Sequence, residues 1–81
     1  MKISVGDRVG AILSATADTV HLLGYGVYEG YCTVPDLDVE NPKIRLDDGR
    51  IVWGYQCWWG SEEVVRARIG DRKIVPATIE D

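Results

Sequence analysis

Hydrophobic and polar residues alternate along most of this chain, a pattern that predicts short β-strands. Residues 6–14, GDRVGAILS, begin with a Gly-Asp turn and continue into a strand. Residues 14–19 are small and polar, so we expect a loop there. Residues 20–34, VHLLGYGVYEGYCTV, are rich in Val, Leu and Tyr and predict one long strand.

Three glycines lie on one alternating face of this long stretch, at positions 24, 26 and 30. Glycine inside a strand usually marks a bulge, a bend or the close approach of another group. We therefore expect a strongly bent strand that serves two sides of a barrel. Tyr28 shares the glycine face, whereas Tyr25 and Tyr31 point to the opposite one.

The next segment predicts a loop and then a hairpin. Residues 35–42, PDLDVENP, are bounded by prolines and carry three acids, so we expect an acidic connecting loop. In KIRLDDGRIVWGY, Asp48-Gly49 stands between two apolar runs and favours a two-residue type I′ turn. This turn would pair Asp47 with Arg50, Leu46 with Ile51, Arg45 with Val52, Ile44 with Trp53, and Lys43 with Gly54.

A short helix is predicted after the last tryptophan. Ser61 can cap its beginning, and Glu62 and Glu63 stand where the helix dipole favours acids. Gly70 can end it. Apolar residues also alternate with arginines within 64–69, so a strand remains an alternative.

The last segment and the sum of elements define the fold class. Residues 73–79, KIVPATI, predict a final strand, and Pro76 places it at an edge. About five strands, tight turns and one short helix near the C-terminus indicate a mainly β fold. We expect a single domain over residues 1–81.

Two motifs carry a resemblance. GDRVG near the start and GYGVYEG in the second strand resemble the opening of small SH3-like barrels. The whole chain also resembles short single-domain proteins of bacteriophages. The first resemblance implies a small SH3-like barrel, and the second implies a viral protein. Neither carries functional residues over to this chain.

The hairpin register divides the aromatic stretch WGYQCWWG, residues 53–60. Trp53 falls on the apolar face and is interpreted as core. Trp58 falls on the basic and polar face, where it is a candidate binding residue, although it could also pack under the helix or the acidic loop. Trp59 stands at the junction with the helix, where we expect it to act as a hydrophobic staple. The predicted core face holds Ile44, Leu46, Ile51, Trp53, Tyr55 and Cys57, and the other face holds Lys43, Arg45, Val52, Gly54, Gln56 and Trp58.

The tyrosines allow two interpretations. In the first, Tyr25, Tyr28 and Tyr31 form barrel core and oligomer contacts. In the second, they form a platform on which a planar ligand stacks, with the neighbouring glycines allowing close approach.

Composition narrows the function classes. The chain has 81 residues and a net charge of −4, which argues against binding to nucleic acid. A small core rich in Trp is often completed by a second subunit, so we expect a homo-oligomer. No apolar stretch approaches the ~20 residues of a membrane span, so we expect a soluble, cytoplasmic protein without a membrane partner. Cys32 and Cys57 are then expected to be free thiols, with a disulfide between them as the alternative.

Motifs for catalysis and metal binding are missing from the sequence. No nucleophile elbow, phosphate loop or zinc-protease motif occurs, so we expect a protein that is not an enzyme. His21, Cys32 and Cys57 are the soft ligands, one fewer than a structural zinc site normally needs. The acids of the 35–42 loop lack the spacing of a calcium loop. We expect neither a metal nor a cofactor.

The basic residues suggest a binding function. One group, Lys43, Arg45 and Arg50, lies on the hairpin, and a second group of four lies within residues 66–73. Arginine forks suit phosphates and carboxylates. Our leading hypothesis is a non-enzymatic module that captures an anionic, ring-containing small ligand such as a nucleotide, for example as a phage sponge against host nucleotide immune signalling. The alternative is a protein–protein interaction module, or an inhibitor that docks on a host protein. The candidate ligand-binding residues are Lys43, Arg45, Gln56, Trp58 and Tyr28.

Overall fold

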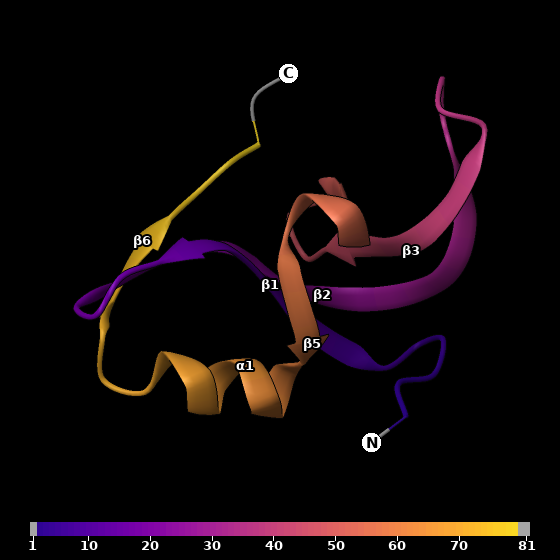
Figure 1. Cartoon of the computed structure of the whole chain (residues 1–81). Coiled ribbons are helices and arrows are strands. Elements are labelled where there is room, and N and C mark those ends of the chain that lie inside the picture. Colours follow the sequence, from indigo (N-terminus) through magenta and orange to yellow (C-terminus); the bar gives the residue numbers. More distant parts are fainter. Residues whose placement is uncertain (1, 80–81) are drawn as a thin grey trace.

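The computed structural model describes residues 2–79, which form one curved β-sheet and one short α-helix packed beneath it (Figure 1). The mainly β fold with a single short helix near the C-terminus is therefore confirmed. The elements are β1 (Arg8–Ala15), β2 (Thr19–Val34), β3 (Val39–Leu46), β4 (Ile51–Trp53), the 3₁₀ turn η1 (Gly54–Gln56), β5 (Trp58–Ser61), α1 (Glu62–Ile69) and β6 (Lys73–Pro76).

Strand β2 organises the sheet. The strand order is β4-β3-β2-β1-β5, with antiparallel neighbours, and β6 pairs in parallel with the start of β2. The first half of β2 pairs with β1 and β6, and its second half pairs with β3. The long strand thus serves two sides of the sheet, as predicted. The sheet curls without closing within residues 2–79, and η1 spans from β4 to β5, an arrangement that fits a small SH3-like barrel.

Glycine is required where β2 and β3 meet. A Cβ atom at Gly26 would lie 2.0 Å from the carbonyl oxygen of Arg45, so no other residue fits there. The prediction of a close approach is confirmed at this position, and the approaching group is the backbone of β3. The glycine face of β2 is therefore covered by the sheet at Gly26, where no ligand can reach it.

The register of the β3–β4 hairpin differs by one residue from the prediction. Arg45 pairs with Ile51, and the amide of Leu46 donates to the carbonyl of Arg50 at 2.8 Å, so the turn holds three residues. Gly49 takes the left-handed position at φ +94°. The carboxylate of Asp48 accepts from the amide of Arg50 at 3.0 Å and stabilises this longer turn.

This shift changes which residue of β4 enters the core. Val52 is 3% exposed and faces Ile44, whereas Ile51 is 36% exposed. A one-residue slip moves a strand's side chains to the opposite face. The prediction that Ile51 and Trp53 share the core face was wrong for this reason.

The connection between β2 and β3 is also shorter than predicted. The turn covers residues 35–38, and residues 39–42 already belong to β3. Asp36 and Asp38 adopt positive φ angles of 71° and 53°, a conformation that aspartate tolerates better than most residues. With these two residues the chain reverses within residues 35–38, and the remainder of the expected loop pairs with β2.

Buried side chains form two clusters, one on each side of the β1–β2 pair. The second cluster joins Ile12 and Val20 of the sheet to Val65 and Ile69 of α1. Burying an aliphatic side chain of this size contributes about 1.5–3 kcal/mol, so these contacts hold the helix against the sheet. The first cluster contains Val9, Ala11, Leu23, Tyr28, Ile44, Leu46 and Val52.

Local signals set the ends of α1 as predicted. The hydroxyl of Ser61 accepts from the amide of Val64 at 3.2 Å. Gly70, at φ +58°, closes the other end, where its amide donates to the carbonyl of Arg66 at 3.1 Å. The alternative of a strand over these residues is excluded.

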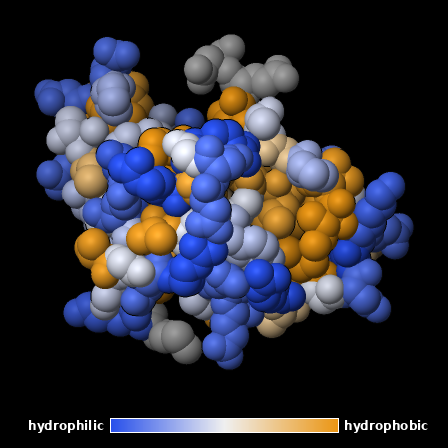
Figure 2. All heavy atoms as spheres, turned by 180° about the vertical axis from the view of Figure 1, so that it is seen from behind, coloured by the Kyte–Doolittle hydropathy of each residue, from blue (hydrophilic) through white to orange (hydrophobic). Residues whose placement is uncertain are grey.

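Several apolar side chains remain at the surface. Figure 2, which views the molecule from behind, shows a broad hydrophobic area at the right, on the side of the molecule where β6 lies at the left of Figure 1. Ile74 of β6 is 48% exposed. The turn between β2 and β3 also carries exposed apolar groups, among them Leu37. Cys32 and Cys57 are free thiols. None of the helices within residues 2–79 has the length and apolar character to cross a bilayer.

Candidate binding site

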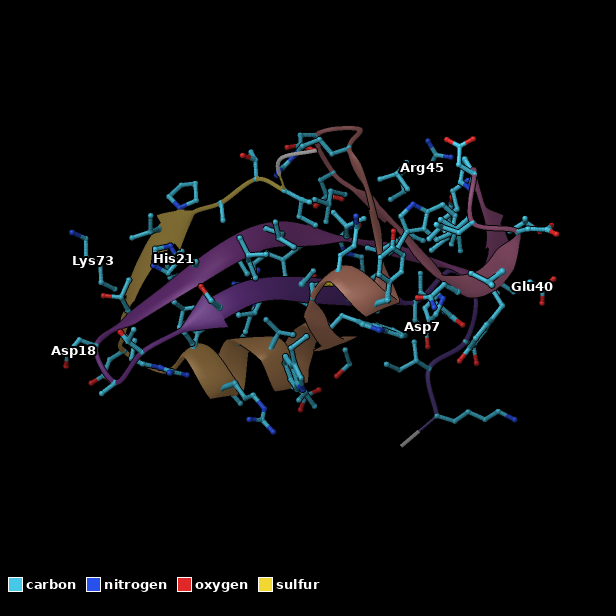
Figure 3. The ribbon with its side chains drawn as sticks, turned by 45° about the horizontal axis from the view of Figure 1, so that its top comes forward. Asp7, Asp18, His21, Glu40, Arg45 and Lys73 are labelled. Carbon is cyan, nitrogen blue, oxygen red and sulfur yellow. The ribbon has the colours of Figure 1, made fainter. Side chains whose placement is uncertain are left out.

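The cations that were predicted to bind ligand already have a partner. Lys43 and Arg45, on β3, both pair with Glu29, at 3.7 Å and 2.9 Å (Figure 3 shows Arg45). The hydrogen bonds from Arg45, together with both positive charges, hold the pKa of Glu29 below its usual range. Lys43 and Arg45 therefore belong to an ion-pair cluster on the outer face of the sheet.

Trp58 lies elsewhere. It pairs with Ile12 across β5 and β1, and two strands separate β5 from β3 in the sheet order. The predicted common face of Trp58 with Lys43 and Arg45 was wrong. It assumed one continuous strand from Ile51 onward, and η1 interrupts that strand.

Gln56 and Tyr28 have structural contacts. The side-chain oxygen of Gln56 accepts from the amide of Trp53 at 2.9 Å and fixes η1. Tyr28 is 7% exposed and stacks on Trp59, with ring centroids 5.1 Å apart. Its burial raises the pKa of the Tyr28 hydroxyl. The structure thus does not bring the five predicted residues into one site.

The tyrosine platform is absent because the three rings lie in different places. Tyr25 packs against the cluster between the sheet and α1, and the Arg66 guanidinium lies 4.3 Å from the centroid of its ring. Tyr28 belongs to the other core cluster. Tyr31 is 66% exposed. A shift of register between Tyr28 and Tyr31 also breaks the simple alternation used to assign their faces.

The aromatic stretch divides differently from the prediction. Cys57 and Trp59 pack against the first core cluster, so Trp59 is a core residue and does not staple the helix. Burial raises the pKa of the Cys57 thiol to about 11. Tyr55 is 55% exposed because η1 turns it away from the core. Trp58 is exposed, as predicted, with 40% of its surface accessible.

A surface hollow of about 220 Å³ surrounds Trp58. Trp58 comes from β5, and the end of β1 supplies Ile12 to Ala15. Arg68 comes from the end of α1, and Arg72 comes from the turn after it. The guanidinium carbon of Arg68 lies 4.4 Å from the centroid of the Trp58 ring. We call this hollow, lined by Ile12 to Ala15, Trp58, Arg68 and Arg72, the Trp58 hollow.

The two arginines of the Trp58 hollow lack carboxylate partners among the residues that the structure describes. Neither Arg68 nor Arg72 takes part in an ion pair within residues 2–79. Arg72 instead donates to the carbonyl oxygens of Thr16, Arg68 and Ile69. The hollow therefore combines an exposed indole with two positive charges that form no ion pair among residues 2–79.

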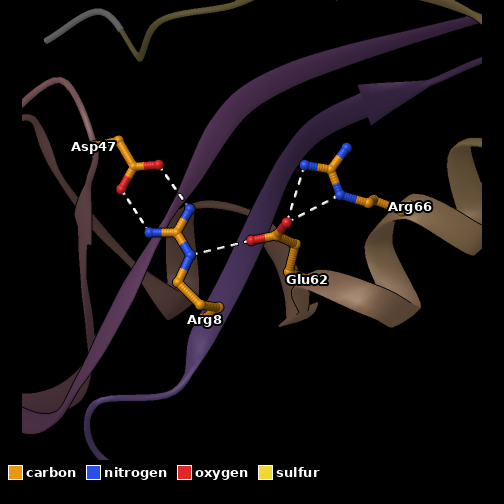
Figure 4. Close-up of polar contacts among 4 residues, drawn as sticks. All are labelled: Arg8, Asp47, Glu62 and Arg66. Atoms are coloured by element: carbon orange, nitrogen blue, oxygen red, sulfur yellow. Dashed lines mark hydrogen bonds and ion pairs between the residues drawn. The ribbon is translucent and has the colours of Figure 1, made fainter.

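Other arginines near α1 are neutralised by acids (Figure 4). Arg8 donates to both carboxylate oxygens of Asp47 at 2.7 Å and to Glu62 at 3.1 Å. Glu62 also pairs with Arg66 at 2.9 Å. We call Arg8, Asp47, Glu62 and Arg66 the Arg8 network. It joins β1, the hairpin turn and α1, and its charges cancel.

Reasoning from the sequence grouped Arg68 and Arg72 with other C-terminal cations but did not place them beside Trp58. One signal for this placement existed in the sequence. β5 is short and α1 follows it directly, so Trp58 at the start of the strand lies near the helix.

Comparison with known proteins assigns no family: no family model, curated protein or solved structure matches the chain. The function must therefore be inferred from the site. No group of three or more His, Cys, Asp and Glu side chains suited to a metal ion occurs within residues 2–79. An indole and two guanidinium groups are suited to holding a planar anion.

Proposed function

We propose that the protein is a non-enzymatic binding module that captures an anionic, ring-containing small ligand, such as a nucleotide, in the Trp58 hollow. The observation that carries this proposal is an exposed indole beside Arg68 and Arg72, which have no ion-pair partner within residues 2–79. Arginine can hold phosphate oxygens in a bidentate manner. A tryptophan ring can stack on any of the nucleic-acid bases, because every base has a π-face.

The size of the hollow limits the ligand. Sites for drug-sized ligands usually measure about 300–1,000 Å³, and the Trp58 hollow measures about 220 Å³. One base or one mononucleotide-sized group matches this space. A larger nucleotide would extend beyond it over the surface.

The resemblance to short bacteriophage proteins suggests how such a module would be used. A viral protein that binds a host nucleotide signal without turning it over would lower the free concentration of that signal. We propose this sponge role for the protein, with the Trp58 hollow as its binding site.

Isothermal titration calorimetry with mono-, di- and cyclic nucleotides tests the proposal. Arg68→Gln and Trp58→Leu remove the charge and the ring, and Arg45→Gln is the matched control on β3. We expect Arg68→Gln to weaken binding roughly tenfold or more, because a hydrogen bond to a charged group contributes about 1.5–3 kcal/mol. Arg45→Gln should leave binding unchanged. No heat with any nucleotide, or equal losses in Arg68→Gln and Arg45→Gln, would contradict the site.

A protein–protein interaction module is the second candidate. Val64 is 41% exposed and Trp58 40%, and both approach Gly60. An exposed Trp side chain is a frequent hot spot of protein interfaces. In a pull-down, this candidate predicts a stoichiometric protein that Val64→Asp releases and Arg68→Gln retains. Retention by Val64→Asp would count against it.

A further inference from the structure

The two arginines of the Trp58 hollow are held in different ways. Arg72 is half-buried, and it donates to Ile69 at 3.3 Å, to Thr16 at 3.0 Å and to Arg68. These bonds connect the end of α1 to the turn between β1 and β2. Arg68 is exposed, and its guanidinium rests on the indole of Trp58. Arg72 is thus a fixed charge, and Arg68 is free to change its contact.

Arg72 keeps hydrogen-bonding capacity in its fixed position. An arginine has five N–H groups, and three of those of Arg72 donate to carbonyl oxygens, which leaves two. A phosphate that meets these two groups would find a guanidinium already oriented. Little side-chain entropy is then lost on binding.

Arg68 occupies the place that a ring would need. Its guanidinium carbon lies 4.4 Å from the centroid of the Trp58 ring, which is the contact distance of a stacked group. A base can stack on this face only when Arg68 leaves it. Arg68 and Arg72 line the same hollow, so a released Arg68 guanidinium can reach the same anion.

We propose that the Trp58 hollow selects a phosphate monoester dianion attached to a planar ring, an inference that rests on the proposed function. Arg72 is the fixed half of a two-arginine clamp. Arg68 is the exchanging half. Its guanidinium leaves the indole of Trp58, on which the ring of the ligand then stacks, and moves to the phosphate. A dianion satisfies both arginines, whereas a cyclic phosphodiester carries one charge and a nucleoside carries none.

Calorimetry on the wild-type protein tests this selectivity with three matched sets of probes. The sets are the four nucleoside 5′-monophosphates, their 3′,5′-cyclic monophosphates and the uncharged nucleosides, with inorganic phosphate added as a ring-free probe. We expect at least one 5′-monophosphate to bind roughly tenfold or more tightly than its cyclic form, its nucleoside and phosphate. Arg68→Gln should reduce the preference over the cyclic form to near unity. Arg45→Gln should preserve it.

The outcomes separate the two proposals. A cyclic monophosphate or nucleoside that binds as tightly as the 5′-monophosphate would overturn the dianion selectivity and leave the binding module standing. So would binding that is confined to larger nucleotides, or a preference that Arg68→Gln retains. No binding by any nucleotide would overturn both.

The exchange has its own readout in the indole signal of Trp58, which Trp58→Leu identifies by NMR. In the wild type, a 5′-monophosphate should move this signal strongly, because a base replaces the guanidinium on the ring. A Trp58 signal that stays in place while the ligand binds would overturn the exchange.

Discussion

Arg8 and Arg68 are both exposed arginines that lie against or on α1, yet their surroundings differ. Arg8 meets Asp47 and Glu62 in the Arg8 network, and its charge is cancelled. Arg68 meets an indole in the Trp58 hollow and has no ion-pair partner within residues 2–79. The difference indicates two uses of one residue type. The first arrangement connects elements of the fold, and the second leaves charge available for a ligand.

The largest effect on stability is expected at the contact that holds α1 against the sheet, because both the Arg8 network and the Trp58 hollow depend on this helix. α1 carries Glu62 and Arg66 of the Arg8 network as well as Arg68, and Ile69, 4% exposed, packs it against the sheet. Ile69→Ala should lower the free energy of unfolding by about 2–5 kcal/mol. Chemical denaturation measures this loss. A loss below about 1 kcal/mol would show that the helix is held in some other way.

The second prediction compares how the loss of Arg8 and the loss of Arg68 change thermal stability. Arg8→Gln removes three hydrogen bonds to carboxylates and leaves Asp47 without its ion-pair partner, so the Tm should fall. Arg68→Gln removes no ion pair of the described part of the chain, so the Tm should remain close to that of the wild type. Thermal unfolding of both variants under one condition provides the comparison. Equal changes in Tm would remove the distinction.

The third prediction concerns pH. Hydrogen bonds from Arg66 and Arg8 lower the pKa of Glu62, and those from Arg8 lower the pKa of Asp47. Both carboxyls have lower pKa values in the folded than in the unfolded chain. Their stabilisation is therefore fully present above the unfolded values of about 4 and is lost as the pH falls through the folded values.

Unfolding measured from neutral pH down to about pH 3, which spans these values, checks the prediction. Arg8→Gln should flatten the acid dependence of stability, whereas Arg68→Gln should keep the wild-type profile. An unchanged profile in Arg8→Gln would mean that these carboxyls do not control the acid transition.

The smallest expected effect is that of salt. Exposed ion pairs are screened as ionic strength rises, so added salt should weaken the Arg8 network slightly. The wild type should lose a little more stability with salt than Arg8→Gln does. Denaturation at low and high salt measures the difference. A larger salt effect in Arg8→Gln would contradict the assignment.

The parts of the fold that depend on local signals could be predicted from the sequence. Ser61 and Gly70 define α1 through contacts with their own neighbours in the chain. The long strand β2 follows from its composition, and its glycines indicated a close approach, which occurs between Gly26 and the backbone of β3.

The hairpin register could not be predicted because two turns were compatible with Asp48-Gly49. The observed turn is stabilised by the Arg50 contacts of Asp48, and it presents Asp47 to Arg8 from a distant strand. The second contact is tertiary and leaves no trace in local spacing. An error of one residue then assigned the wrong residues of β4 to the core.

One residue of the Trp58 hollow was predicted from the sequence. The exposed indole of Trp58 was anticipated, and arginine was the residue type expected to bind the ligand. The partners were not, because η1 breaks the strand and because Arg45 is taken by Glu29. Which cations remain uncompensated depends on packing between distant segments.

The most direct measurement is an NMR titration of the isotope-labelled protein with a nucleoside 5′-monophosphate. Its result maps the binding site onto individual residues. If the uncompensated arginines bind the ligand, the largest shifts will occur at the Trp58 indole and at Arg68 and Arg72. Shifts centred on Lys43 and Arg45, or no shifts with any nucleotide, would contradict this account.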